Sequence, residues 1–189
     1  MADPFFFGYG SLVNRATQTY PDATLATLDG WRRIWRYTSA RDVAYLSVFP
    51  SASTQIEGLI AHVPGADWVA LDEREAAYAR HRVTPSVRHG VARPVDIQVY
   101  AVPVEPEQTI QGDRHIILSY LDVVVQGYLR EFGEAGVQRF FETTDGWDAV
   151  ILDDRAAPQY PRHQRLRADE TTLVDDWITQ LGCQKRQAV

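Results

Sequence analysis

The feature that most constrains this fold is a run of three phenylalanines at residues 5–7, which ends in the glycine-rich loop of residues 8–12. A short, wholly apolar run closed by glycines is typical of a buried strand that feeds a tight turn. Further strands are expected where apolar residues cluster or alternate between turn residues. These segments are residues 31–37, 44–49, 56–63 and 95–104.

Helical spacing of apolar residues dominates the second half of the chain. Asp67 is a good N-cap for a helix over residues 68–80, and Gly182 is a natural C-cap for a last helix over residues 170–181. Helices are also expected over residues 114–132 and 134–142. Strands first and helices mostly later predict an α+β fold, with a strongly curved sheet or barrel and helices against it.

The length of 189 residues indicates a single domain that buries a core without disulfides or metals. Residues 143–189 form a C-terminal extension of unassigned role, and residues 143–167 within it look irregular. The extension would cover a pocket mouth, pack on the sheet or contact a second copy. The sequence does not choose between these, and it leaves the oligomeric state open.

Composition excludes several classes of protein. A net charge of −6 argues against a nucleic-acid binder, so the alternating aromatic and basic residues at 31–36 are interpreted as a strand with its aromatics inward. Cys183 is the single cysteine, which rules out an intrachain disulfide and fits a reducing compartment. The sequence shows no signal peptide and no run of 18 apolar residues, so a cytoplasmic protein without a membrane partner is expected.

The loop of residues 8–12 is the first candidate site. Its glycines let main-chain N–H groups point at a ligand, where they would hold a carboxylate or a developing oxyanion. An ordinary turn after a strand explains the same residues, and the loop alone does not decide between the two.

Glu75 is the second candidate. On a helical wheel it falls between Trp68 and Leu71, in the middle of the apolar face, while Glu73 and Arg74 point elsewhere. Burial there raises the pKa of a carboxyl group, as a general base near neutral pH requires. The alternatives are a structural glutamate paired with an arginine such as Arg80 or Arg82, and a helix boundary misplaced by two residues.

The remaining polar residues are weaker candidates. The histidines at 62, 81, 89, 115 and 163 lack the spacing of a helical metal pair, so no metal and no cofactor are expected. The arginines at 155, 162, 165 and 167 would draw an anionic substrate, although a solvated loop is the preferred interpretation.

Taken together, these features resemble the γ-glutamylcyclotransferase family. The resemblance rests on residues 6–12 (FFGYGSL), 71–75 (LDERE), 78–83 (YARHRV) and 120–127 (YLDVVVQG), whose order and approximate spacing agree with the family from residue 5 to about 133. The chain departs from the family at Leu12, where Asn is common, and after Phe132, where no G-L-P follows. Residues 143–189 have no counterpart that we assign.

The resemblance implies a small mixed β-barrel flanked by helices and an enzyme without a cofactor. Its site would use Glu75 as the general acid/base, Tyr9, Gly10, Ser11 and Leu12 as the substrate loop, and Tyr120 as a pocket residue. The reaction would release 5-oxoproline and a free amine from an L-γ-glutamyl amide such as a dipeptide, an amine conjugate or glutathione. The alternatives are an enzyme that removes a γ-glutamyl protecting group, a non-catalytic γ-glutamyl-binding or regulatory domain, and a single-strand nucleic-acid binder.

Overall fold

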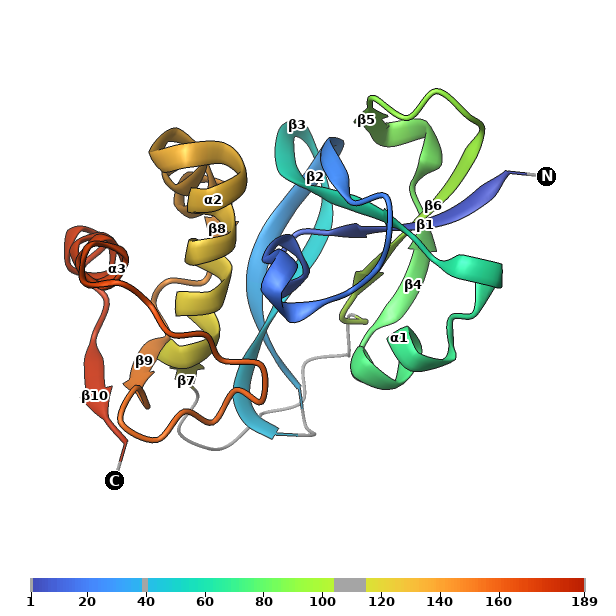
Figure 1. Cartoon of the computed structure of the whole chain (residues 1–189). Helices are drawn as coiled ribbons and strands as arrows, with labels where there is room; N and C mark the ends of the chain where they lie inside the picture. The colour runs from blue at the N-terminus through green and yellow to red at the C-terminus, as the bar shows by residue number, and fades with distance from the viewer. Residues whose placement is uncertain (1, 39–40, 104–114, 189) are drawn as a thin grey trace.

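The computed structural model describes residues 2–38, 41–103 and 115–188 (Figure 1). Its strands are β1 (Asp3–Gly8), β2 (Thr24–Thr38), β3 (Arg41–His62), β4 (Ala79–Arg82), β5 (Val87–His89), β6 (Val95–Ala101), β7 (His115–Ile117), β8 (Thr144–Asp145), β9 (Val150–Asp153) and β10 (Lys185–Gln187). Its helices are α1 (Val69–Arg74), α2 (Leu118–Glu142) and α3 (Ala168–Gln180), with 3-10 turns η1 (Ser11–Val13), η2 (Arg15–Thr17), η3 (Pro64–Ala66) and η4 (Thr84–Ser86). Val104 and Arg114, which end one predicted strand and begin one predicted helix, lie outside the described residues.

The strands form one mixed sheet in the order β10-β9-β7-β3-β1-β6-β4, with β2 pairing β3 and carrying β5 and β8. β1 runs antiparallel to β3 and parallel to β6, so both of its edges are paired and its phenylalanines are buried. The α+β prediction is confirmed. The predicted barrel is wrong as a closed form, because the path of paired strands ends at β10 and β4 without joining.

Two predicted strands, residues 44–49 and 56–63, prove to be parts of the single long strand β3. β3 pairs with β2 along most of its length, and the register shifts between Asp29 and Trp31, where Gly30 has a φ of +76°. An irregularity of this kind lets extra residues pass without ending the ladder, which is why the turn residues between the two predicted strands misled the prediction.

The predicted helix over residues 68–80 is wrong in its second half. α1 ends at Arg74, and Glu75 follows with φ −104° and ψ 33°. Residues 79–82 instead form β4 and pair with β6, so ladder hydrogen bonds override the helical pattern of the sequence.

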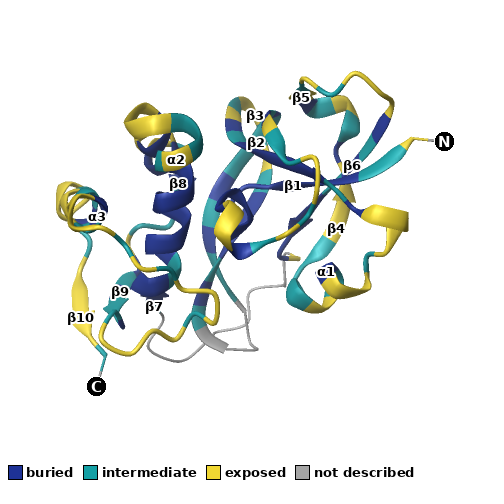
Figure 2. Cartoon of the chain, in the orientation of Figure 1, coloured by how far each residue is buried: buried dark blue, intermediate teal, exposed yellow. Residues whose placement is uncertain are grey.

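The helices predicted over residues 114–132 and 134–142 are both present from Leu118 onward, within α2, and Gly133 (φ +66°, ψ −172°) breaks the helix between them. α3 has Leu181 as its C-cap, and the predicted capping residue Gly182 follows directly, with the left-handed φ of +68° that ends a helix. Figures 1 and 2 show α2 with its buried face toward the sheet and α3 beyond it.

Residues 143–167 are less irregular than predicted, because β8 pairs with β2 and β9 pairs with β7. β10 pairs with β9, and α3 packs against α2 through Val174 and Ile178, which are buried in the core. The extension therefore packs on the sheet, and residues 159–162 within it also line a cavity, so two of the three arrangements that the sequence left open are present together.

Candidate active site

The loop of residues 8–12 leaves the sheet at Gly8 and enters η1 at Ser11. Both of its glycines stand where the chain has no room for a side chain. A Cβ on Gly8 would lie 2.6 Å from the Cβ of Leu12, and a Cβ on Gly10 would lie 2.7 Å from the Tyr120 hydroxyl oxygen. Gly10 therefore allows Tyr120 of α2 to reach the loop backbone.

The backbone of this loop is anchored from the core side. The Tyr9 carbonyl accepts hydrogen bonds from the Tyr128 hydroxyl at 2.9 Å and from Nε of Arg33 at 3.3 Å. Arg33 is only 1% exposed and also donates to the Glu57 carbonyl at 2.6 Å. The Tyr9 hydroxyl donates to the Tyr100 carbonyl at 2.6 Å, so both ends of Tyr9 are held by the protein.

Helix α2 is fixed to the same loop on its other side. Asn14 follows η1, and its side-chain amide donates to the Val123 carbonyl and to Gln126, both at 3.0 Å. A Cβ on Gly127 would lie 2.8 Å from the Asn14 backbone nitrogen, so glycine permits this close approach. The position of Tyr120 relative to the loop is thus set by packing along the helix.

Glu75 lies at the C-terminal end of α1, with its side chain 16% exposed. The prediction that Arg74 points away from Glu75 is wrong, since Nε of Arg74 lies 3.3 Å from a carboxylate oxygen of Glu75. Arg74 also donates to the Thr17 carbonyl at 2.8 Å and to the Ser11 hydroxyl at 3.2 Å, and so joins Glu75 to the loop.

The alternative that pairs Glu75 with an arginine is correct in kind, because Arg74 is its partner, but it is wrong in naming Arg80 or Arg82. Arg80 pairs with Asp72 at 2.9 Å and Arg82 pairs with Asp96 at 2.5 Å. The other alternative was correct in part, because the helix boundary was misplaced. Glu75 is nevertheless largely buried, with 16% of its side chain exposed, and it lines the cavity directly after the end of α1.

Burial raises the pKa of the Glu75 carboxyl group, and the positive charges of Arg74 and Arg162 offset part of that rise. Four tyrosines, Tyr9, Tyr78, Tyr100 and Tyr120, line the same cavity as this carboxyl group. Burial also raises the pKa values of Tyr9, Tyr78 and Tyr120, so these hydroxyls stay neutral near pH 7. The site therefore holds one titratable acid among neutral hydrogen-bonding groups.

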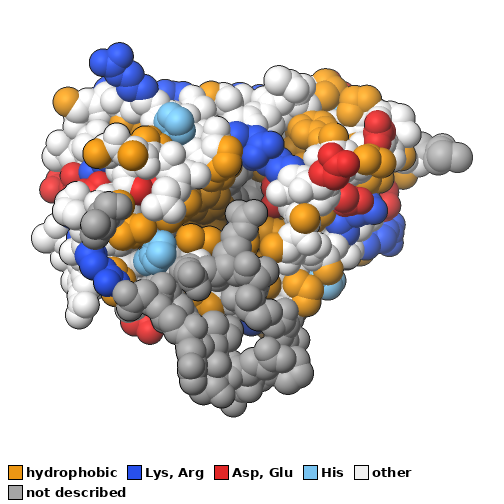
Figure 3. Space-filling view, turned by 90° about the horizontal axis from the view of Figure 1, so that it is seen from below, with side chains coloured by type: hydrophobic (Ala, Val, Ile, Leu, Met, Phe, Trp, Pro, Cys, Tyr) orange, Lys and Arg blue, Asp and Glu red, His pale blue; other side chains and the backbone are white. Residues whose placement is uncertain are grey.

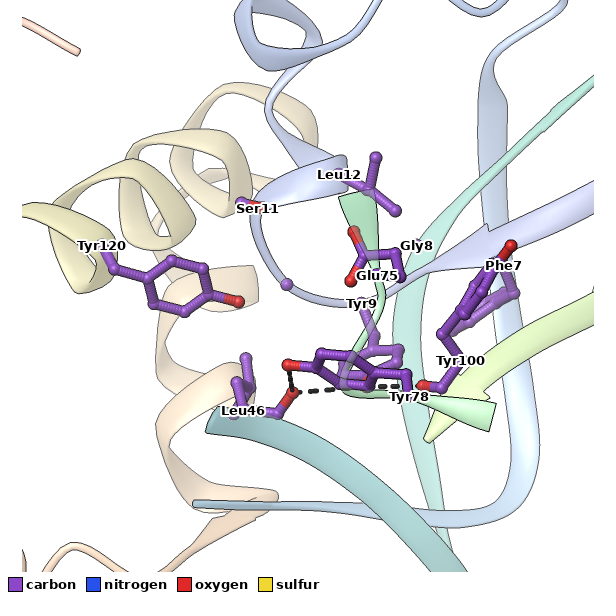
Figure 4. A pocket seen from close by; sticks show the side chains of 11 residues that line it. Phe7, Gly8, Tyr9, Ser11, Leu12, Leu46, Glu75, Tyr78, Tyr100 and Tyr120 are labelled. Atoms are coloured by element: carbon purple, nitrogen blue, oxygen red, sulfur yellow. Dashed lines mark hydrogen bonds between the residues drawn. The ribbon is translucent and has the colours of Figure 1, made fainter. Parts of the chain in front are cut away.

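Two connected cavities meet at Glu75. The inner cavity has a volume of about 30 Å³, and it is lined by Phe7, Gly8, Tyr9, Gly10, Ser11, Leu12, Leu46, Glu75, Tyr78, Tyr100 and Tyr120. The outer cavity has about 650 Å³ and adds Tyr45, Glu73, Arg74, Ile117 and residues 159–162 among others. Figure 4 shows Glu75 beside the loop with Tyr120 facing it, and Figure 3 shows a hollow with hydrophobic lining.

The structure brings together all six residues that the sequence singled out as site residues. Lining residues that were missed as such include Leu46, Arg74, Tyr78, Tyr100 and Tyr160. The sequence could have indicated Tyr78, because this residue begins the family-like segment of residues 78–83 (YARHRV). It could not have indicated Tyr160, which lies in a segment without periodicity, although the Tyr160 hydroxyl donates to the Ser11 hydroxyl at 2.9 Å.

Within the described residues, no group of three or more His, Cys, Asp or Glu side chains is arranged to hold a metal ion. The helices of that same part are all too short or too polar to cross a membrane.

Comparisons with known proteins agree with this architecture. The model of the family described as "Gamma-glutamyl cyclotransferase, AIG2-like" matches residues 6–119. No curated protein matches the sequence significantly.

Solved structures show a similar fold at low sequence identity. YkqA from Bacillus subtilis has a TM-score of 0.57 at 16% identity over 75% of this chain, which spans only 54% of that protein. The uncharacterized protein loc79017 from Homo sapiens has a TM-score of 0.55 at 12% identity, with 90% of this chain and 97% of that chain covered. A structure titled "Gamma-glutamyl cyclotransferase" has a TM-score of 0.52 at 12% identity, with 91% and 98% covered.

Proposed function

Because this chain belongs to the γ-glutamyl cyclotransferase, AIG2-like family, we propose that it converts an L-γ-glutamyl amide into 5-oxoproline and a free amine. The observation that carries this proposal is the Glu75 carboxyl group, buried with a raised pKa beside the loop of residues 8–12. A carboxyl group placed in this way is suited to exchange protons with a bound amine.

The proposed reaction is an intramolecular acyl transfer. The α-amine of the γ-glutamyl group arrives protonated and gives one proton to the ionised Glu75. The freed amine attacks the γ-carbonyl carbon, the γ-carbonyl π bond opens and a five-membered ring forms. The amide C–N bond then breaks as the carbonyl re-forms. The departing nitrogen takes up both protons that the α-nitrogen loses, one delivered by Glu75 and one from the ring nitrogen, so the amine leaves as an ammonium ion and Glu75 is ionised again.

The cavity would contribute mainly by orientation. A γ-glutamyl chain is flexible, and the reaction requires that its nitrogen and its γ-carbon meet. The backbone N–H groups of residues 9–12 are the proposed donors to the substrate oxygens, including the developing oxyanion. The Tyr120 hydroxyl interacts with the Ser11 N–H, and we assign it a place beside the reacting carbonyl.

The test is Glu75→Gln, which keeps the size of the side chain and removes the base. We expect 5-oxoproline release to fall by at least about 100-fold, because a general acid/base contributes that much. The assay would screen γ-glutamyl-alanine, γ-glutamyl-lysine and glutathione, with Glu134→Gln as a control that removes an exposed carboxylate far along α2.

Near-wild-type turnover by Glu75→Gln would overturn the proposed role of this residue. Tight calorimetric binding of these amides by the wild type, without turnover of any, would identify a binding or regulatory domain instead.

A further inference from the structure

This inference concerns the leaving amine, and it rests on the proposed function. The inner cavity, at about 30 Å³, is too small to hold a whole γ-glutamyl amide. It shares Ser11, Glu75, Tyr78 and Tyr120 with the outer cavity of about 650 Å³. A substrate whose γ-carbonyl lies beside Glu75 therefore extends its leaving group into the outer cavity.

One wall of the outer cavity comes from residues 159–162, which lie beyond the residues matched by the family model. This wall is fixed at its first two residues, Gln159 and Tyr160. Asp154 accepts hydrogen bonds from the backbone N–H groups of Ser119 at 2.7 Å and of Gln159 at 2.8 Å. Tyr160 donates through its backbone to the Ser119 hydroxyl at 3.2 Å and through its side chain to Ser11 at 2.9 Å.

The charged side chains that line this cavity differ in whether they are paired with other residues. Among the described lining residues, the acidic and basic side chains are Glu73, Arg74, Glu75 and Arg162. Arg74 is held by Glu75, Ser11 and Thr17. Arg162 is exposed and forms no ion pair with any described residue, and it lines the same cavity as Glu75, whose pKa its charge lowers.

We propose that Arg162 binds a carboxylate on the leaving amine, so that this protein prefers γ-glutamyl amino acids or peptides to amides of uncharged amines. An unpaired guanidinium on a wall anchored beside the reacting loop is a suitable partner for such a carboxylate. Glu73 of α1 repels the same carboxylate and so directs it toward residues 159–162.

The experiment compares γ-glutamyl-alanine with γ-glutamyl-alaninamide, which differ only in the charge at the end of the leaving group. For the wild type we expect kcat/KM to be about 5- to 10-fold higher for the charged substrate, the size of one partly exposed charge contact. Arg162→Gln should remove this preference by slowing only γ-glutamyl-alanine, and Arg162→Lys should restore part of it. Arg165→Gln is the matched control, since Arg165 lines a different cavity.

The outcomes separate this inference from the proposed function. Equal kcat/KM values for the two substrates in the wild type, or an unchanged preference in Arg162→Gln, would overturn the role of Arg162 while cyclisation stands. Absence of 5-oxoproline from both substrates and from glutathione would instead overturn the proposed function. An unchanged melting temperature in Arg162→Gln shows that the variant is folded, as expected for an exposed side chain.

Discussion

The inner and outer cavities share five lining residues, but they are built in different ways. The inner cavity is made by β1, its loop, the end of α1 and the start of α2, and its walls are buried and anchored to the core. The outer cavity is completed by residues 159–162, which carry exposed charge. The difference suggests a division of roles, with the chemistry assigned to the buried part and the choice of leaving group to the exposed part.

The substitution expected to disrupt the inner cavity most is Gly10→Ala. Its Cβ would lie 2.7 Å from the Tyr120 hydroxyl oxygen but 3.9 Å from the ring carbon that carries it. We expect a loss of about 1–3 kcal/mol in the free energy of unfolding, because overpacking forces the helix and the loop apart. Turnover should fall as well, since the loop no longer meets Glu75 correctly.

The double variant Gly10→Ala/Tyr120→Phe sharpens this prediction, because removing the hydroxyl leaves an ordinary contact. It should regain part of the lost stability in urea unfolding, because a contact of 3.3 Å between the new Cβ and Cδ2 of Leu46 remains, and additive losses would contradict the proposed clash. Gly90→Ala is the control, since a Cβ there meets nothing within 4 Å.

A smaller effect is expected on the pH dependence of turnover. As the base must be ionised, kcat should rise with pH through the raised pKa of Glu75. Arg74→Gln removes a charge that lowers this pKa, so the rising limb should move to higher pH. The other titratable groups near Glu75 are Arg162, whose charge also lowers the pKa, and the neutral hydroxyls of Tyr9, Tyr20, Tyr78, Tyr100 and Tyr120.

The control for this experiment is Arg80→Gln, because Arg80 pairs with Asp72 and does not act on Glu75. If the rising limb of the pH profile moves equally in Arg74→Gln and Arg80→Gln, the shift reflects a general disturbance near α1 and not the loss of the Arg74 charge.

The smallest effect is expected from Tyr160→Phe, which loosens the outer wall. This change removes the hydrogen bond to Ser11 at 2.9 Å and leaves the ring against Tyr120. We expect a cost of about 0.5–1.5 kcal/mol in stability and a modest rise in KM with kcat nearly unchanged. A fall in kcat as large as that of Gly10→Ala would mean that the two cavities act as one.

The inner and outer cavities also differ in how well the sequence predicted them. β1 and its loop were predicted well, because phenylalanines between glycines leave few alternatives. Glu75 was chosen for a partly mistaken reason, since it follows the short helix α1 instead of lying within a long one. The local pattern could not reveal that residues 79–82 pair with β6, which is a long-range interaction.

The wall of the outer cavity could not be predicted from the sequence, for a related reason. Asp154 and Tyr160 are positioned by hydrogen bonds to Ser119 and Ser11, more than thirty residues away along the chain. Irregular segments have no period, so nothing in residues 154–167 indicates which side chains face a cavity. The sequence showed four arginines in this part of the chain, but it did not show that Arg162 is the one among them that lines the outer cavity.

The double anchoring of the Tyr9 carbonyl has one more consequence. The peptide plane between Tyr9 and Gly10 cannot rotate unless the bonds from both Arg33 and Tyr128 break together. In a trans peptide the N–H group points opposite to the carbonyl, so the Gly10 N–H keeps one direction before any ligand arrives. The Gly10 N–H therefore has a fixed orientation when a ligand reaches the loop, and the loop backbone loses little conformational entropy on binding.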